Sequence, residues 1–294
     1  MKMTPTFGPA GVALLAGMAL LSGCGEKAPQ IGFAASGAGY HEKPDFAQVE
    51  YDHPLVPADL QKITPRNLAA LTQEQVDQVY ARLTAGPIPD GPFEGKVLLP
   101  KGGSGKFRAA EILGGFKGMV VNLKGKKLET MAETLWKGKV FYRDQRVLRN
   151  RIEDLTLLKS VISGDLGTIP KISVNGRDAW LLFPAKLYCG QSLLDGRRES
   201  VIIDYAFTDE IEGYRELPDF LAGRRGLKVR DEIRMIRPGF YLGRAYMDRA
   251  FVLNFTLYNE EIAGRDGAAF LKTGQRSEDC WSGTQQTRVV TAAK

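Results

Sequence analysis

Charged side chains interrupt several apolar stretches in the second half of this 294-residue chain. Asp204 stands inside VIIDYAF, and Arg230, Glu232 and Arg234 fall on one face of the alternating stretch KVRDEIRMIR. Further arginines follow: Arg237, Arg244 and Arg249. An unpaired buried charge is costly, so charges that enter a core must pair or meet a ligand, and arginines can hold a carboxylate or phosphate by two hydrogen bonds. A ladder of alternating charges on a solvated face is the alternative, and both interpretations stay open.

Other motifs that suggest chemistry fail on inspection. The stretch KGGSGKF, residues 101–107, lacks the Ser or Thr and the earlier glycine of a phosphate-binding loop. GQSLL lacks the second glycine of a nucleophile elbow, and the chain has no HExxH and only two histidines, His41 and His53. We therefore predict no cofactor and no metal site. A carboxylate-based hydrolase or isomerase using Asp204 and Glu232 stays open, because spacing selects no acid and base.

The first of the three cysteines, Cys24, ends a segment typical of a secretory signal. Lys2 supplies a positive charge and residues 11–21 an apolar run, which is shorter than the roughly 20 residues a membrane-spanning helix needs. Leu21-Ser22-Gly23-Cys24 resembles the lipobox of bacterial lipoproteins. This resemblance implies a signal peptide over residues 1–23 and acylation of Cys24, for example with palmitate, which anchors the protein to a membrane of the cell envelope.

The position after the cysteine bears on which membrane holds the anchor. Gly25 is not the Asp that marks inner-membrane retention in enteric bacteria, so the outer membrane facing the periplasm is favoured. Export also affects the other two cysteines, Cys189 and Cys280, because disulfides persist outside the cytoplasm. Paired, they would close a loop of roughly 90 residues, worth about 4 to 5 kcal/mol in loop-closure entropy.

The pattern of charges along the chain argues against a protein that binds nucleic acid. The formal net charge is +6, but 40 basic residues are interleaved with 34 acidic ones instead of forming a basic block. A solvated surface of mixed charge explains this pattern. The functional alternative is that the excess positive charge binds anionic lipid or lipopolysaccharide. The predicted partners are a membrane, through the acyl anchor, and a lipid or other amphiphile, with no nucleic acid; the sequence does not identify a protein partner.

The elements that must position these residues begin with helices. Residues 24–70 lack periodicity and are predicted to be a flexible tether, and residues 71–294 to be one β-rich globular domain with N-terminal helices. Thr72 and Gln75 form a capping box, and the apolar residues that follow have helical spacing: Val76, Val79, Tyr80 and Leu83. A second helix is predicted over residues 127–136.

From Lys139 onward, apolar residues recur at every second position, as they do in strands with one buried face. Asn175-Gly176 in KISVNGRDAWLLF and Asp195-Gly196 in SLLDGRRESVIIDYAF are turn signals between strand-like stretches. The second stretch puts Val201, Ile203, Tyr205 and Phe207 on one face, and RAFVLNFTLY puts Phe251, Leu253, Phe255 and Leu257 on one face. The predicted fold class is mainly β with short flanking helices (α+β), as an antiparallel β-barrel or curled sheet, a calycin-like barrel among them.

Two short motifs carry a family resemblance. Gly91-Pro92-Phe93-Glu94-Gly95 and the later stretch WKGKVF, residues 136–141, are similar to the two signatures of the GXWXG domain. The chain departs at Phe93, where the family has Trp. The resemblance spans residues 89–258 and implies a small β-rich domain with no settled activity.

These observations predict an envelope lipoprotein that binds a lipid or another amphiphile in a β-rich cavity. The candidate cavity walls are aromatic: Trp136, Trp180, Tyr205, Tyr241 and Phe255. Asp204, Arg234 and Arg244 are candidate polar partners, the arginines for a head group. The alternatives are an envelope enzyme, and a structural or assembly lipoprotein with a filled barrel and an exposed apolar patch.

Overall fold

A closed antiparallel β-barrel forms the centre of the protein. The computed structural model describes residues 29–37, 42–100, 134–158, 165–174 and 176–283. Within these ranges the strands are β1 (Gly91–Leu98), β2 (Trp136–Tyr142), β3 (Val147–Ile152), β4 (Lys171–Val174), β5 (Arg177–Gln191), β6 (Glu199–Asp204), β7 (Val229–Arg237), β8 (Phe240–Met247) and β9 (Ala250–Tyr258). They pair in the order β3-β2-β1-β9-β8-β7-β6-β5-β4, and β3 also pairs with β5. That pairing closes a barrel of eight strands, while β4 extends β5 beyond it, and the predicted fold class is confirmed.

The predicted turns join strands as expected. β4 and β5 form a hairpin that pairs Val174 with Arg177, and Gly176 has a positive φ of 74° that suits a tight turn. Asn175 lies outside the described residues. Asp195 and Gly196 belong to the loop between β5 and β6, whose last pair is Gln191 with Glu199.

The predicted strand faces hold with two exceptions. Val201, Ile203 and Tyr205 belong to the apolar core inside the barrel, but β6 ends at Asp204 and Phe207 is exposed. On β9, Leu253, Phe255 and Leu257 face this core. Phe251 instead stacks against Tyr246, 5.9 Å between ring centroids, because a β-bulge shifts the pairing of β8 and β9 at this point.

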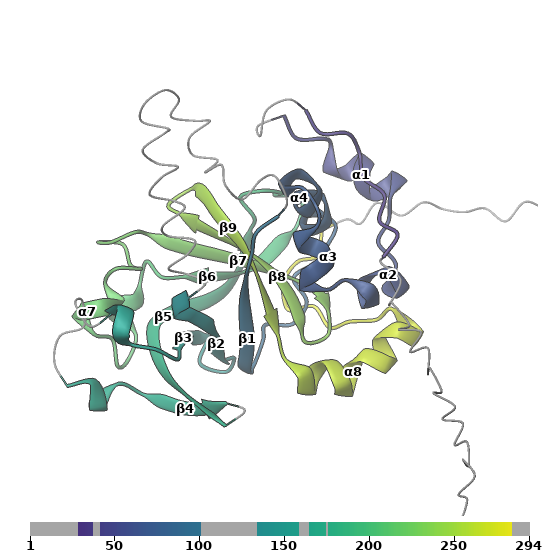
Figure 1. Cartoon of the computed structure of the whole chain (residues 1–294). Coiled ribbons are helices and arrows are strands. Elements are labelled where there is room, and N and C mark those ends of the chain that lie inside the picture. The colour runs from purple at the N-terminus through teal and green to yellow at the C-terminus, as the bar shows by residue number, and fades with distance from the viewer. Residues whose placement is uncertain (1–28, 38–41, 101–133, 159–164, 175, 284–294) are drawn as a thin grey trace, which may run out of the picture.

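Short helices cover one side of the barrel. The N-terminal helices are α1 (Phe46–Asp52), α2 (Pro57–Lys62), α3 (Pro65–Ala69) and α4 (Gln73–Ala81), and α8 (Glu260–Thr273) follows the last strand. They occupy the right-hand side of Figure 1, opposite β4 and the short α7 (Glu216–Asp219). Three 3₁₀ turns complete the described elements: η1 (Thr156–Leu158), η2 (Leu166–Thr168) and η3 (Thr208–Glu210).

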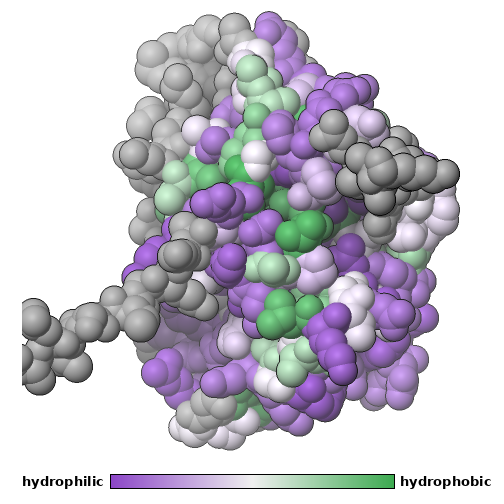
Figure 2. Space-filling view, turned by 90° about the vertical axis from the view of Figure 1, so that its right-hand side faces the viewer, coloured by the Kyte–Doolittle hydropathy of each residue, from purple (hydrophilic) through white to green (hydrophobic). Residues whose placement is uncertain are grey.

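The helical layer has its own apolar core against the outer barrel wall. Side chains of α2, α3, α4 and α8 bury against outward residues of β7 and β8 such as Ile236 and Leu242. The predicted capping box of α4 is present, with Thr72 Oγ1 accepting from the Gln75 amide. Seen from the helical side, hydrophobic surface residues are interrupted by hydrophilic ones (Figure 2).

The tether predicted over residues 24–70 is wrong for its described part. Leu60, Ile63 and Leu68 are fully buried, and Phe33 packs against the same core. The extended segment near Ala34 also pairs with the Gln78 side chain, through bonds of 2.9 and 3.0 Å. Apolar burial therefore holds this segment on the barrel. Of the helix predicted over residues 127–136, only positions 134 and 135 are helical within the described part, and Trp136 begins β2.

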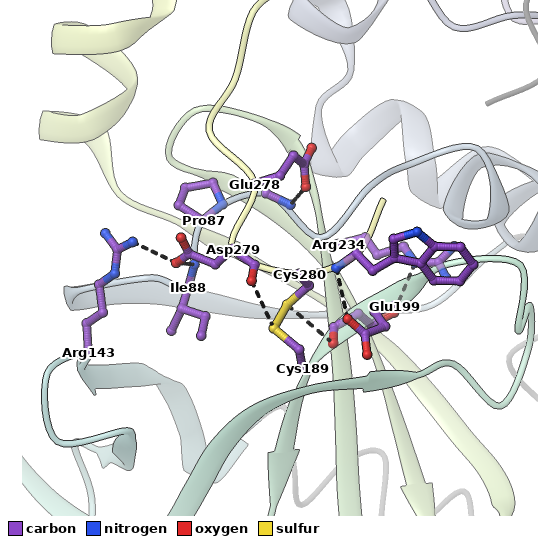
Figure 3. The surroundings of a disulfide bond; sticks show 12 residues. Pro87, Ile88, Arg143, Cys189, Glu199, Arg234, Glu278, Asp279 and Cys280 are labelled. Carbon is purple, nitrogen blue, oxygen red and sulfur yellow. Dashed lines mark hydrogen bonds and ion pairs between the residues drawn. A yellow bond between two sulfur atoms is a disulfide. The ribbon is translucent and has the colours of Figure 1, made fainter. Parts of the chain in front are cut away.

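The predicted disulfide between Cys189 and Cys280 is present, with sulfur atoms 2.13 Å apart. It fastens the C-terminal segment to β5 (Figure 3). Next to it, Asp279 accepts a bond of 2.9 Å from the Ile88 amide and one of 2.6 Å from Arg143. The segment after α8 is therefore held by covalent and ionic contacts together.

Candidate functional site

The barrel contains an apolar cavity of about 270 Å³ that opens near the side where α7 lies. Its described walls come from seven barrel strands and from the loop that follows α7, through apolar residues such as Val97, Phe183, Leu221, Val229 and Leu253. Three of the predicted aromatic residues, Trp136, Tyr205 and Phe255, line it as well. The other part of the barrel interior is filled by aromatic packing, in which Phe93 contacts Phe141 and Tyr241 edge to face at 5.4 and 5.8 Å.

A small polar cluster lies at the cavity wall. The Lys139 ammonium donates to Tyr205 Oη at 2.7 Å, to Asn150 Oδ1 at 2.9 Å and to Asp231 Oδ2 at 2.9 Å. Trp136 Nε1 donates to the same Asn150 oxygen at 3.0 Å. Alternating strand geometry brings Lys139, Asn150 and Asp231 inward, because each lies in the phase of its strand that faces the core, and Tyr205 directly follows the end of β6.

The cluster is electrostatically balanced. Burial by itself would lower the pKa of Lys139, but the Asp231 carboxylate and the Tyr205 hydroxyl raise that pKa above its ordinary value of 10.5. Burial raises the pKa of Tyr205 to about 12, so its phenol is neutral at physiological pH. Lys139 and Asp231 therefore form a buried ion pair in an apolar site.

Aromatic rings surround the ammonium group. The rings of Trp136, Tyr205 and Phe255 have their centroids 5.4, 5.3 and 5.5 Å from Lys139 Nζ, within the range of cation–π attraction. Trp136 and Phe255 also pack edge to face at 5.4 Å. The same aromatic residues thus form cavity wall and stabilise the buried cation.

Two glycines let Trp136 take this place. A Cβ at Gly95 would come within 2.5 Å of the Trp136 ring, and a Cβ at Gly138 within 2.0 Å of the Phe93 carbonyl oxygen. Gly138 also has a positive φ of 140°. These glycines belong to the two motifs that resemble the GXWXG signatures, and they allow β1 and β2 to approach closely beneath the indole.

The other predicted wall residues lie elsewhere. Tyr241 is inside the barrel core, where its hydroxyl donates to the Pro87 carbonyl at 2.7 Å, but it does not line the cavity. Trp180 lies where β4 pairs with β5, with Lys171 Nζ 4.9 Å from its ring centroid. Asp204 points away from the interior and accepts a 2.8 Å bond from Tyr188 Oη.

The charged face of β7 is paired, as one interpretation required, but it lies outside the barrel. Arg230, Glu232 and Arg234 share this face, which is largely buried and not a solvated ladder. Arg234 is fully buried against α4, donating to Ser200 Oγ at 2.9 Å and to Asp195 Oδ2 at 3.3 Å. The charges pair within the interface between barrel wall and helices.

Arg244 follows the same pattern. It is fully buried, pairs with Asp77 of α4, and donates to Tyr246 Oη at 2.9 Å. Burial opposes ionisation of Asp77, but Arg244 and Lys43 hold its pKa below the usual range. Both arginine candidates for a ligand head group therefore act as structural ion-pair partners.

Sequence reasoning missed Lys139, Asn150 and Asp231. The sequence does hold a local signal for Asn150 and Asp231, because each is a polar residue among the apolar residues of the inward strand face. Asp231 shares the inward phase of β7 with Val229 and Ile233, and Asn150 shares that of β3 with Leu148 and Ile152. A single polar residue in an otherwise apolar phase marks a group that the core must satisfy or that a ligand meets.

The fold and site define a class: a closed β-barrel with an apolar cavity whose wall carries a buried ion pair. No known family profile matches the chain, and no curated protein matches it either. One solved structure, of a protein from Thermomonospora curvata, is similar at 15% sequence identity. That similarity covers 65% of this chain and 88% of the other, with a TM-score of 0.31.

Proposed function

We propose that this protein is an envelope lipoprotein whose barrel binds a small amphiphile without chemical turnover. The observation that carries the proposal is the cavity itself, whose walls are apolar apart from one cluster around Lys139 and Asp231. Sites for small molecules combine such walls with a few polar groups that orient the ligand. An apolar body with one polar end fits this arrangement.

The size of the cavity narrows the class of ligand. Its volume of about 270 Å³ lies just below the roughly 300–1,000 Å³ typical of sites for drug-sized ligands. A compact or single-chain amphiphile fits this volume better than a lipid with two long acyl chains.

The groups in the cavity favour binding over catalysis. A nucleophilic or Schiff-base lysine needs a lowered pKa, whereas that of Lys139 is raised, so the amine stays protonated. Asp204 and Glu232, the carboxylates of the enzyme alternative, lie outside the cavity lining, and Asp231 is the one carboxylate among the described lining residues. An acid and base pair of carboxylates is therefore missing from this lining.

Filling the cavity should weaken probe binding. Ala245→Phe places a ring in the cavity lining, and we expect affinity for the neutral fluorescent probe N-phenyl-1-naphthylamine to fall at least about tenfold, because the ring occupies much of the space. Ala268→Phe, on the exposed surface of α8, is the matched control and should bind as the natural protein does. Equal binding by both variants, or no probe binding and no co-purifying amphiphile in native mass spectrometry of the natural protein, would overturn the proposal.

The membrane anchor is the second part of the proposal. Cys24 and its lipobox lie outside the described residues, and no helix in the described ranges has the length and apolarity to span a bilayer. Support comes from the tetrad Leu21-Ser22-Gly23-Cys24 and from the Cys189–Cys280 disulfide, which fits an oxidising compartment such as the periplasm.

Acylation can be measured directly. Cells expressing the natural chain and labelled with radioactive palmitate should incorporate label into this protein, which should fractionate with the outer membrane. Cys24→Ala should lose the label, whereas Cys189→Ala should keep it because that variant retains Cys24 and Cys189 is a disulfide cysteine. Unchanged labelling of Cys24→Ala would remove the anchor from the proposal while leaving the cavity untouched.

A further inference from the structure

The polar cluster of the cavity satisfies almost all of its own hydrogen bonds. All three donors of Lys139 are used, by Asn150, Tyr205 and Asp231. The Asn150 amide donates to Tyr205 Oη at 2.9 Å and to the Phe183 carbonyl at 3.0 Å. Tyr205 has acceptors for its own proton in Asn150 Oδ1 at 3.3 Å and Asp231 Oδ2 at 3.4 Å. These groups have no donor left for a ligand.

One atom is different. Asp231 accepts both of its bonds at Oδ2, and no donor from the described part of the chain reaches its second oxygen, Oδ1. Asp231 lines the cavity although only 4% of the residue is exposed. This oxygen is accessible from the cavity, so a ligand that supplies a donor would form a charge-assisted hydrogen bond with it. The cavity therefore offers an acceptor for a donor group of a ligand.

The charge balance of the cavity determines which kind of donor group a ligand can supply. Lys139 already neutralises Asp231, so an added carboxylate or ammonium group would leave one uncompensated charge in an apolar cavity, at high cost. A carboxylate would also set acceptor against acceptor. A hydroxyl group donates one hydrogen bond and adds no charge.

Building on the proposed function, we propose that the ligand is a neutral amphiphile with a hydroxyl group that donates to Asp231 Oδ1. Its apolar body lies along the walls formed by residues such as Phe255, Leu253 and Val229. Fatty acids and alkylamines are disfavoured.

A ligand series with one apolar body tests this in the natural protein. Displacement of N-phenyl-1-naphthylamine is measured with 1-decanol, decyl methyl ether, decanoate and decylamine. We expect 1-decanol to bind roughly tenfold more tightly than its methyl ether, which lacks only the donor, and than both charged ligands. Equal affinities, or tighter binding of decanoate, would overturn the hydroxyl preference but keep the amphiphile site. Failure of every ligand and of the probe would instead overturn the proposed function.

A variant tests the role of Asp231 itself. Asp231→Asn leaves the Lys139 charge without its counter-ion, so the preference should invert, with decanoate binding more tightly than 1-decanol. Asp204→Asn makes the same change on the outer barrel wall and should leave the order of affinities unchanged. An unchanged order in a folded Asp231→Asn variant contradicts the assignment. If that variant does not fold, the series in the natural protein decides.

Discussion

Replacing Lys139 with methionine is expected to lower the free energy of unfolding by about 3–5 kcal/mol. Methionine keeps an unbranched apolar chain of similar length, so the variant removes the charge with little change in packing. It leaves Asp231 buried without a counter-ion, in a side chain only 6% exposed. Tyr205 and Asn150 each lose a hydrogen-bond donor as well.

Urea unfolding at pH 7, followed by circular dichroism, measures this loss. Lys186→Met is the matched control, because Lys186 and its partner Glu210 are 39% and 47% exposed, and such surface pairs contribute less than about 1 kcal/mol. In a second control, Lys139→Met combined with Asp231→Leu should recover much of the stability, since no buried charge then remains.

The pH dependence has a defined sign. The folded-state pKa of Lys139 lies above 10.5, so its stabilising contribution is complete below that pH and is lost only as the pH rises through the folded-state value. The natural protein therefore gains nothing from this group on acidification. Lys139→Met lacks this contribution at every pH, so the gap in stability between the two proteins should narrow as the pH rises through the folded-state pKa of Lys139. A gap that widens at high pH, or a loss below about 1 kcal/mol at pH 7, would contradict the buried ion pair.

Alternation predicted the barrel because a period of two records which strand face is buried. It could not predict what covers the other face. Arg234 and Arg244 lie in the polar phase of their strands and are fully buried all the same, because helices pack over that wall. Asp77 of α4 pairs with Arg244, and Asp195 of the loop between β5 and β6 pairs with Arg234. The four N-terminal helices contain five to nine residues each, and the first three are too short to show a helical period in the sequence. The burial of residues such as Leu60 and Leu68 against the barrel stabilises these short helices.

The cavity was predictable in part for a related reason. Aromatic residues in the apolar phase signalled walls, and Trp136, Tyr205 and Phe255 are such walls. Lys139 and Asp231 are 92 positions apart and meet only because the curled sheet brings β2 and β7 to opposite sides of one cavity. Sequence spacing holds no record of that approach. The phase of each polar residue within its strand is the local signal that remains.

Removing the disulfide should cost about as much stability as breaking the buried ion pair. Cys189 and Cys280 are 91 positions apart, and the loop-closure entropy of a cross-link over that distance is worth about 4–5 kcal/mol. The strong constraint on the unfolded chain arises because the bond encloses β6 to β9 and α8 in one loop. The folded C-terminal segment keeps its other contacts, among them the bond of 2.7 Å from the Gly86 amide to Glu278.

The experiment compares the Cys24→Ala protein, which has no third thiol, with the same protein carrying Cys189→Ala and Cys280→Ala. Urea unfolding should show the double replacement to be less stable by the stated amount. Reductant should destabilise the first protein to a similar extent and leave the second unchanged, because only the first has a bond to reduce. Probe binding to the cavity should persist in both while they are folded, since neither Cys189 nor Cys280 lines the cavity. A loss below about 1 kcal/mol would contradict the loop-closure argument for this disulfide.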